Sequence, residues 1–167
     1  ESHIHQLPNR HEFTVVALAG SVGKTSTKLA IADLLSQTKR VRHQLCNYDD
    51  RVTVPLVLFG QTEPSILNVF AWLKIFISNA WDLGREFAYD VVVVELGSDG
   101  PRQLEKFAYL APEIAVVTAV TPEHMEYFKT LDAVAAEELA VFEFSKCVLV
   151  NTDDIAAKYL ADRTFEA

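Results

Sequence analysis

A glycine-rich turn followed by a lysine and a threonine lies near the start of the chain, where residues 19–26 read Ala-Gly-Ser-Val-Gly-Lys-Thr-Ser. Glycines let successive backbone N–H groups curl around phosphate oxygens, a lysine reaches the β- and γ-phosphates, and a hydroxyl holds Mg²⁺. The pattern fits the short form G-x-x-G-K-T, but Leu18 stands where the longer form has an earlier glycine. We therefore predict a phosphate-binding loop, and its predicted binding residues are Gly20, Ser21, Val22, Gly23, Lys24, Thr25 and Ser26. The alternative is an ordinary glycine-containing turn before a helix, with a surface lysine.

Two further polar residues follow other apolar runs. Glu95 ends the run Val-Val-Val-Val-Glu at 91–95, and His124 follows the run 114–120 through Thr-Pro-Glu. Ligands bind outside the carboxyl ends of the strands in open α/β sheets, so both side chains are expected on the rim that carries the loop. Glu95 and Thr25 form a candidate Mg²⁺ pair, because Mg²⁺ takes one or two carboxylates together with phosphate oxygens and water. The alternatives are a carboxylate that only caps the next helix and a histidine that only makes structural hydrogen bonds.

Strand-like and helix-like segments alternate along the chain. Strands are expected at 14–19, 41–45, 90–96, 114–120 and 147–150, and helices at 24–37, 101–110, 131–144 and 153–163. Residues 52–59 are ambiguous between strand and helix, because Pro55 is poor in the interior of either. The alternation predicts an α/β fold with a doubly wound, mostly parallel sheet of the P-loop NTPase type.

The longest apolar stretch covers residues 66–83. Polar residues such as Asn68, Lys74 and Asp82 interrupt it, so we expect no membrane span. Its apolar residues occupy more than half of the circumference of a helix, which predicts a mostly buried core helix. The alternatives are contact with an absent partner domain or with a membrane surface.

Composition and charge limit the class of protein. The chain has 167 residues, which fits one domain, and is 50% hydrophobic and 23% charged, which excludes disordered and collagen-like classes. Lys and Arg number 15 against 23 Asp and Glu, so a basic face for nucleic acid is not expected. Cys46 and Cys147 are expected to be reduced thiols of a cytoplasmic protein, with Cys147 buried and structural. Residues 1–12 lack the apolar core of a signal peptide and are expected to be a linker or a chain end.

Six short segments have the order and spacing of a known family. They are Gly-Ser-Val-Gly-Lys-Thr-Ser-Thr-Lys at 20–28, Asn47-Tyr48, Val-Val-Glu-Leu-Gly at 93–97, Ala-Pro-Glu-Ile-Ala-Val-Val-Thr at 111–118, Glu-His-Met-Glu-Tyr-Phe at 123–128 and Val-Asn-Thr-Asp-Asp at 150–154. Together they resemble the central, ATP-binding domain of the Mur ligases. The Glu-Leu-Gly form of the acidic strand is most similar to the MurF type, which joins UDP-N-acetylmuramoyl-tripeptide to D-alanyl-D-alanine.

The resemblance implies a reaction and a set of roles. In the family, a substrate carboxylate attacks the γ-phosphoryl of ATP, and an incoming amine captures the acyl phosphate to form an amide, ADP and phosphate. Lys24 and His124 would then be catalytic, Thr25 and Glu95 would bind a first Mg²⁺, and His124 would help to bind a second. Asn47 would lie towards the UDP-muramoyl-peptide substrate.

The resemblance also implies a division into domains. Residues 13–167 correspond to the ATP-binding central domain, and the N-terminal UDP-binding domain and the C-terminal domain of the ligases would be absent from this chain. The isolated chain is therefore expected to be inactive as an ATP-dependent acid–amino-acid ligase.

One departure from the family lies in the helix expected at 131–144. The family commonly has a lysine there, carbamylated by CO₂, in a pattern like Ala-Lys-x-Glu. This chain reads Ala-Glu-Glu-Leu-Ala at 136–140, and Glu138 falls at the lysine position. By sequence alone, Glu137 and Glu138 would be taken for a solvated helix face. Our hypothesis is that Glu138 supplies the carboxylate of the modified lysine, and the alternative is loss of the second-metal function.

Other function classes share this pattern. A non-catalytic nucleotide-binding module would keep the phosphate loop without the ligase chemistry. A relative of folylpolyglutamate synthase would have the same core with a different acceptor. A generic P-loop hydrolase would turn over ATP without any acceptor.

Overall fold

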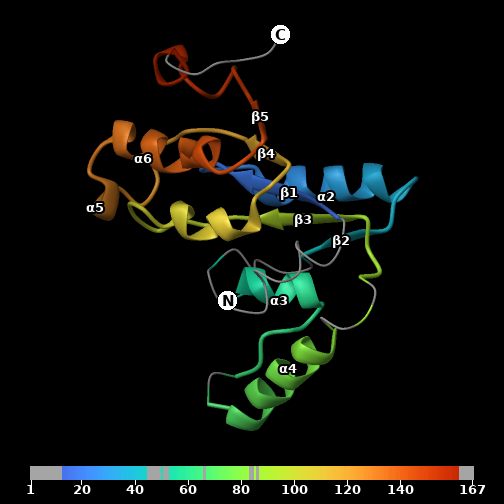
Figure 1. Cartoon of the computed structure of the whole chain (residues 1–167). Helices are drawn as coiled ribbons and strands as arrows, with labels where there is room; N and C mark the ends of the chain where they lie inside the picture. The colour runs from blue at the N-terminus through green and yellow to red at the C-terminus, as the bar shows by residue number, and fades with distance from the viewer. Residues whose placement is uncertain are drawn as a thin grey trace.

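Five strands form one parallel sheet in a computed structural model that describes residues 13–44, 50, 53–65, 67–82, 85 and 87–161. The strands are β1 Thr14–Ala19, β2 Val41–His43, β3 Val91–Glu95, β4 Ile114–Val117 and β5 Cys147–Val150. Their spatial order is β2-β3-β1-β4-β5, and all of the neighbouring pairs run parallel. The predicted α/β fold is confirmed, and the central position of β1 places the turn that follows it in the middle of the carboxyl edge (Figure 1).

Helices lie between the strands in the chain. The structure contains α2 Lys24–Ser36, α3 Thr53–Phe59, α4 Val69–Asp82, α5 Met125–Phe128 and α6 Leu131–Glu138, with short 3-10 helices η2 Leu104–Leu110, η3 Leu139–Glu143 and η4 Ala157–Tyr159. The ambiguous stretch at 52–59 is therefore helical in its described part, and it tolerates Pro55 because that residue lies in the first turn.

Both faces of the sheet are covered, as a doubly wound fold requires. Side chains alternate along β1, so that Val16 and Leu18 pack with Ala32 of α2 on one face. On the other face, Val15 and Ala17 belong to a larger cluster with residues of α3, η2 and α6. Buried strands with apolar residues on both faces explain the unalternating aliphatic runs of the sequence.

Three predicted helices are shorter than expected. The stretch 101–110 forms η2 only from Leu104, and 131–144 divides into α6 and η3 after Glu138. Within 153–161, the only helix is the three-residue η4. Turns fill the remainder of the described C-terminal part.

The prediction of a buried Cys147 is wrong. Cys147 is exposed because it begins β5 at the edge of the sheet, next to Ile114 of β4. In that strand Val148 and Val150 pack against the core, whereas Leu149 is exposed like Cys147. Side chains of this edge strand point alternately towards the core and away from it, and Cys147 is on the side away from the core.

The prediction of a core helix at 66–83 is also wrong. The helix α4 has no buried residue, and its segment exposes large apolar side chains, namely Leu67, Val69, Phe70, Leu73, Phe76, Ile77 and Trp81. Figure 1 shows α4 beyond α3, on the side away from the sheet. No helix in the described residues is long and apolar enough to cross a membrane.

Candidate functional site

The turn between β1 and α2 needs glycine at two positions. Gly20 and Gly23 have φ angles of 120° and 85°, in the region that side chains disfavour. A Cβ atom on Gly20 would lie 2.3 Å from Thr118 Oγ1 and 2.9 Å from the backbone nitrogen of Ala119. The first glycine of the predicted loop is therefore required by the close approach of the segment after β4.

Hydrogen bonds tie this turn to the end of β4. The Ser21 N–H donates to the Ala119 carbonyl at 2.9 Å, and the Thr118 hydroxyl donates to the Val22 carbonyl at 2.6 Å. Ser21 Oγ donates to the Thr121 carbonyl at 3.1 Å and accepts from the Thr121 N–H at 3.0 Å. The backbone of the turn is thus held by the segment that leads to His124.

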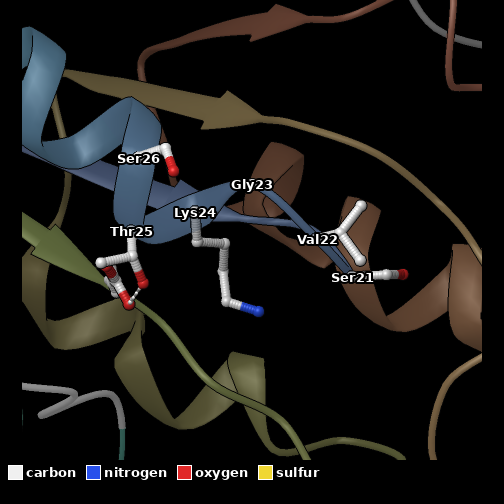
Figure 2. Close-up of a pocket in the computed structure, with 7 residues that line it drawn as sticks. Ser21, Val22, Gly23, Lys24, Thr25 and Ser26 are labelled. Atoms are coloured by element: carbon white, nitrogen blue, oxygen red, sulfur yellow. Dashed lines mark hydrogen bonds between the residues drawn. The ribbon is translucent and has the colours of Figure 1, made fainter.

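A cavity of about 380 Å³ opens beside this turn. It is lined by Ser21, Val22, Gly23, Lys24, Thr25, Ser26 and Glu95 (Figure 2). The Lys24 ammonium donates to the Gly20 carbonyl at 2.6 Å, so the lysine closes back over its own loop. The first N–H groups of α2 have no partner within the helix, and they suit an anion at this end.

Glu95 lies at the same cavity, at the end of β3. The Thr25 hydroxyl donates to Glu95 Oε2 at 3.3 Å, which brings together the predicted Mg²⁺ pair. Hydroxyl and carboxylate oxygens are hard donors, and Mg²⁺ completes its shell with water and phosphate. No group of three His, Cys, Asp or Glu able to hold a metal is found in the described residues, and Thr25 and Glu95 supply one hydroxyl and one carboxylate beside the cavity. These residues therefore fit a phosphate ligand with Mg²⁺.

Lys28 and Gln44 also contact Glu95, and sequence analysis missed both. Lys28 Nζ lies 2.8 Å from Glu95 Oε1, and the two side chains are 1% and 3% exposed. Gln44 accepts from the Glu95 N–H at 2.5 Å and donates to the Glu95 carbonyl at 3.4 Å. The available signal for Lys28 was its spacing, since it follows Lys24 by one helical turn.

Glu138 is buried against the turn. Its Oε2 accepts a hydrogen bond from the Gly20 N–H, so the solvated face considered for this residue is not observed. Burial raises the pKa of the Glu138 carboxyl to about 8; the Lys24 charge and the Gly20 hydrogen bond oppose this effect, and the neighbouring Glu123 adds to it. Glu138 therefore lies in the site, close to the charge of Lys24. Its role as a metal ligand stays a prediction.

Glu137 is buried as well, and it holds the loop after β3. One oxygen accepts from the Ser98 hydroxyl at 2.8 Å and from the N–H groups of Gln103 and Leu104 at 2.8 and 2.7 Å. The other accepts from the Arg102 N–H at 2.5 Å. Sequence analysis missed this function, because adjacent glutamates on a helix are usually solvated.

His124 lies outside the cavity lining. Its backbone has a φ of 44° before α5, and its side chain is 40% exposed. The ring nitrogens lie 3.5 Å from Asp99 Oδ1 and 3.9 Å from Glu126 Oε1. Asp99 follows Glu95 by four residues, so His124 is next to the loop after β3. Its catalytic and metal-binding roles stay predictions, and Asn47 is outside the described residues.

Comparisons with known proteins give one family. The family model described as the Mur ligase middle domain matches residues 18–167. The chain is 30% identical over 138 residues to UDP-N-acetylmuramoyl-tripeptide–D-alanyl-D-alanine ligase of Escherichia coli (strain K12). The aligned residues cover 82% of the chain and 24% of that protein. It is 33% identical over 120 residues to UDP-N-acetylmuramate–L-alanine ligase of Rhodopseudomonas palustris (strain BisB5), and these residues cover 71% of the chain and 19% of that protein.

A solved structure has the same fold. The crystal structure of MurF ligase from Thermotoga maritima in complex with ADP matches with a TM-score of 0.67 and 23% identity, over 96% of this chain and 32% of that one. The chain thus spans about a quarter or less of the length of the two curated relatives, and about a third of the solved one.

Proposed function

The chain belongs to the Mur ligase middle domain family, and on this basis we propose that it forms the ATP-binding core of an ADP-forming amide ligase of peptidoglycan precursor synthesis. The observation that carries the proposal is the meeting of Lys24, Thr25 and Glu95 at one cavity beside the glycine turn. Membership of the family and this donor set both support ATP with Mg²⁺ as the ligand.

The residues of the site suit phosphoryl transfer, in which positioning and charge neutralisation supply most of the catalysis. ATP would supply the phosphoryl group that activates the substrate carboxylate, and Mg²⁺ would neutralise the phosphate charge. The N–H groups of residues 22–26 would bind phosphate oxygens, because those of Gly20 and Ser21 already donate to Glu138 and to the Ala119 carbonyl. Lys24 would leave the Gly20 carbonyl and bind a phosphate oxygen instead. Thr25 Oγ1 and Glu95 Oε2 would hold the cation.

Glu138 belongs to the proposal as a substitute for the carbamylated lysine of the family. Its buried carboxyl group lies against Gly20 and near the charge of Lys24. Because burial raises its pKa to about 8, a bound cation would favour its ionised form, which would supply a carboxylate at this turn without modification by CO₂. His124 would help to bind the second cation. The test is made in the longer ligase, where the Glu138→Lys variant should depend on added bicarbonate for ligase activity, whereas the unchanged ligase should not. Bicarbonate dependence of both proteins, or of neither, would favour loss of the second-metal function.

The acceptor and the flanking domains are part of the same proposal. The Glu-Leu-Gly motif and the similarity to the E. coli ligase favour the MurF type, with UDP-muramoyl-tripeptide and D-alanyl-D-alanine as substrates. We propose that residues 13–167 are the central domain of a longer cytoplasmic ligase, which supplies the UDP-binding and C-terminal domains, and that residues 1–12 are a linker. Asn47 would lie towards the muramoyl substrate.

Two experiments test the function in order. Calorimetric titration of the chain with ATP and Mg²⁺ should show binding, and Lys24→Ala should weaken it by at least about tenfold, as expected for one charge-assisted contact. In the longer ligase, phosphate release should then require a muramoyl-tripeptide and D-alanyl-D-alanine. Binding without acceptor-stimulated turnover would favour a non-catalytic module. Stimulation by a folate acceptor would favour a folylpolyglutamate synthase, and turnover without any acceptor a hydrolase.

A further inference from the structure

Lys28 is a buried cation that the proposed chemistry does not use. It lies on α2, its side chain is 1% exposed, and its ammonium is 2.8 Å from Glu95 Oε1. Lysine is almost never fully buried unless it is paired. A buried ion pair is weak evidence for stability, because desolvation of both charges offsets much of their attraction. The pair therefore calls for an explanation other than the stability of the fold.

The two oxygens of Glu95 have different partners. Oε1 faces Lys28, whereas Oε2 accepts from the Thr25 hydroxyl at 3.3 Å. Thr25 and Lys28 are three residues apart on one helix, so both approach the carboxylate from the same helix face. Thr25 and Glu95 line the cavity, whereas Lys28 is not among its lining residues. The carboxylate is thus oriented with one oxygen towards the core and one towards the phosphate loop.

The backbone of Glu95 is fixed as well. Gln44 accepts from its N–H at 2.5 Å and donates to its carbonyl at 3.4 Å, and Gln44 is itself buried. With the main chain held by Gln44 and Oε1 held by Lys28, the carboxylate cannot rotate without breaking the ion pair. Only Oε2 remains on the side of Thr25.

We infer that Lys28 is a positioning residue that restricts Glu95 to one-oxygen coordination of the divalent cation of the bound nucleotide, and thereby favours Mg²⁺ over Ca²⁺. The inference rests on the proposed function. Mg²⁺ needs a small, near-octahedral shell and accepts single carboxylate oxygens, whereas Ca²⁺ takes six to eight ligands and often both oxygens of a carboxylate. An ammonium on Oε1 removes the two-oxygen mode and leaves the one-oxygen mode.

The test compares nucleotide affinity in Mg²⁺, in Ca²⁺ and in EDTA for the unchanged chain and for Lys28→Met, which keeps the length of the stem. We expect Lys28→Met to lower the Mg²⁺-supported affinity by about tenfold relative to the Ca²⁺-supported one, a change of about 1.4 kcal/mol. The affinity in EDTA should stay within about twofold, because Lys28 does not line the cavity. Lys28→Arg, which keeps a cation, should retain the Mg²⁺ preference.

The matched control is Lys158→Met. Lys158 also lies 2.8 Å from a carboxylate oxygen, that of Asp132, but both side chains are exposed. This variant should leave all three affinities unchanged. Lys28→Met leaves the charge of Glu95 buried without its partner, so this variant could fail to fold. The double variant Lys28→Met/Glu95→Gln buries no unpaired charge, and it is compared with Glu95→Gln. If Lys28 acts through Glu95, the double variant and Glu95→Gln should have the same Mg²⁺ to Ca²⁺ ratio.

Four results would overturn the inference. Equal losses in Mg²⁺, Ca²⁺ and EDTA would make Lys28 a structural residue only. A further shift of the ratio in the Glu95→Gln background would show that Lys28 acts by another route. If the unchanged chain binds no nucleotide in any condition, the proposed function and the inference both fail. If Lys28→Met binds nucleotide normally and its ratio of Mg²⁺-supported to Ca²⁺-supported affinity is unchanged, only the inference fails.

Discussion

The carboxylate of Glu138 accepts a hydrogen bond from the backbone N–H of Gly20, across 118 residues of sequence. This contact joins the end of α6 to the turn after β1, and it places an acidic side chain beside Lys24. Glu138, which by sequence alone would be taken for part of a solvated helix face, is thus part of the candidate site. The burial of this carboxyl, whose effect on its pKa the Gly20 hydrogen bond partly opposes, gives the stability of the protein a defined dependence on pH.

We expect the free energy of unfolding to fall between about pH 4.5 and pH 8 because of Glu138. Burial raises the pKa of this carboxyl in the folded protein to about 8, from 4.5. Its contribution is therefore fully present below about pH 4.5 and is lost as the pH rises through about 8, with a slope of at most about 1.4 kcal/mol per pH unit. Urea denaturation of Glu138→Gln over this range should lack that slope. Glu105→Gln, at an exposed site, is the control, and identical pH profiles for Glu138→Gln and the unchanged protein would contradict the prediction.

Glu137→Ala should strongly destabilise the fold. The substitution leaves the Ser98 hydroxyl and the N–H groups of Arg102, Gln103 and Leu104 without their carboxylate acceptor. We expect a loss of roughly 2 to 4 kcal/mol in the free energy of unfolding, measured by chemical denaturation. Glu126→Ala, at an exposed position, should change it by less than about 0.5 kcal/mol. A small effect of Glu137→Ala would mean that water replaces the carboxylate.

Gly20→Ala should abolish nucleotide binding and lower stability. The added Cβ would lie 2.3 Å from Thr118 Oγ1 and 2.9 Å from two backbone nitrogens, at a φ of 120°. Removal of the hydroxyl in Gly20→Ala/Thr118→Ala should not restore binding, because the backbone contacts and the unfavourable φ remain. Gly100→Ala is the control, since its nearest contact is the flexible end of Gln103 at 3.4 Å. Titration with ATP and Mg²⁺, together with thermal unfolding, would measure both effects, and binding by Gly20→Ala would refute the predicted loop geometry.

Phe70→Ala should leave the stability of the chain nearly unchanged. This ring on α4 is 86% exposed, so its removal should change the free energy of unfolding by less than about 0.5 kcal/mol. Phe107→Ala, which removes a ring that is 2% exposed in η2, should destabilise the chain by about 3 to 5 kcal/mol. Denaturant titration of the two variants gives the comparison. A large loss for Phe70→Ala would show that α4 is covered in solution.

The fold and the centre of the site could be predicted from the sequence because their signals are local. The runs at 14–19 and 91–95 are apolar on both faces, as central parallel strands are, and the glycine turn directly follows the first. Thr25 and Glu95 could be paired because both end up at the carboxyl edge of the same sheet.

The rest depends on tertiary contacts that no local pattern records. The burial of Lys28 follows from a partner 67 positions away, and that of Glu137 from the path of the loop at 98–104. Composition shows that the residues of α4 are apolar, but not whether another element covers them, which is why a core helix was wrongly expected. Cys147 was assigned to the interior because free cysteines are usually buried, and the edge position of β5 overrides that tendency.

Hydrogen bonds join Ser21 and Val22 to residues 118–121, and they couple the glycine turn to a strand that is synthesised about a hundred residues later. The loop cannot adopt its shape from its own segment, because its carbonyl and hydroxyl groups find these partners only after β4 has docked beside β1. Nucleotide affinity would therefore report the docking of β4 beside β1, and it would be absent in nascent chains that end before Thr118.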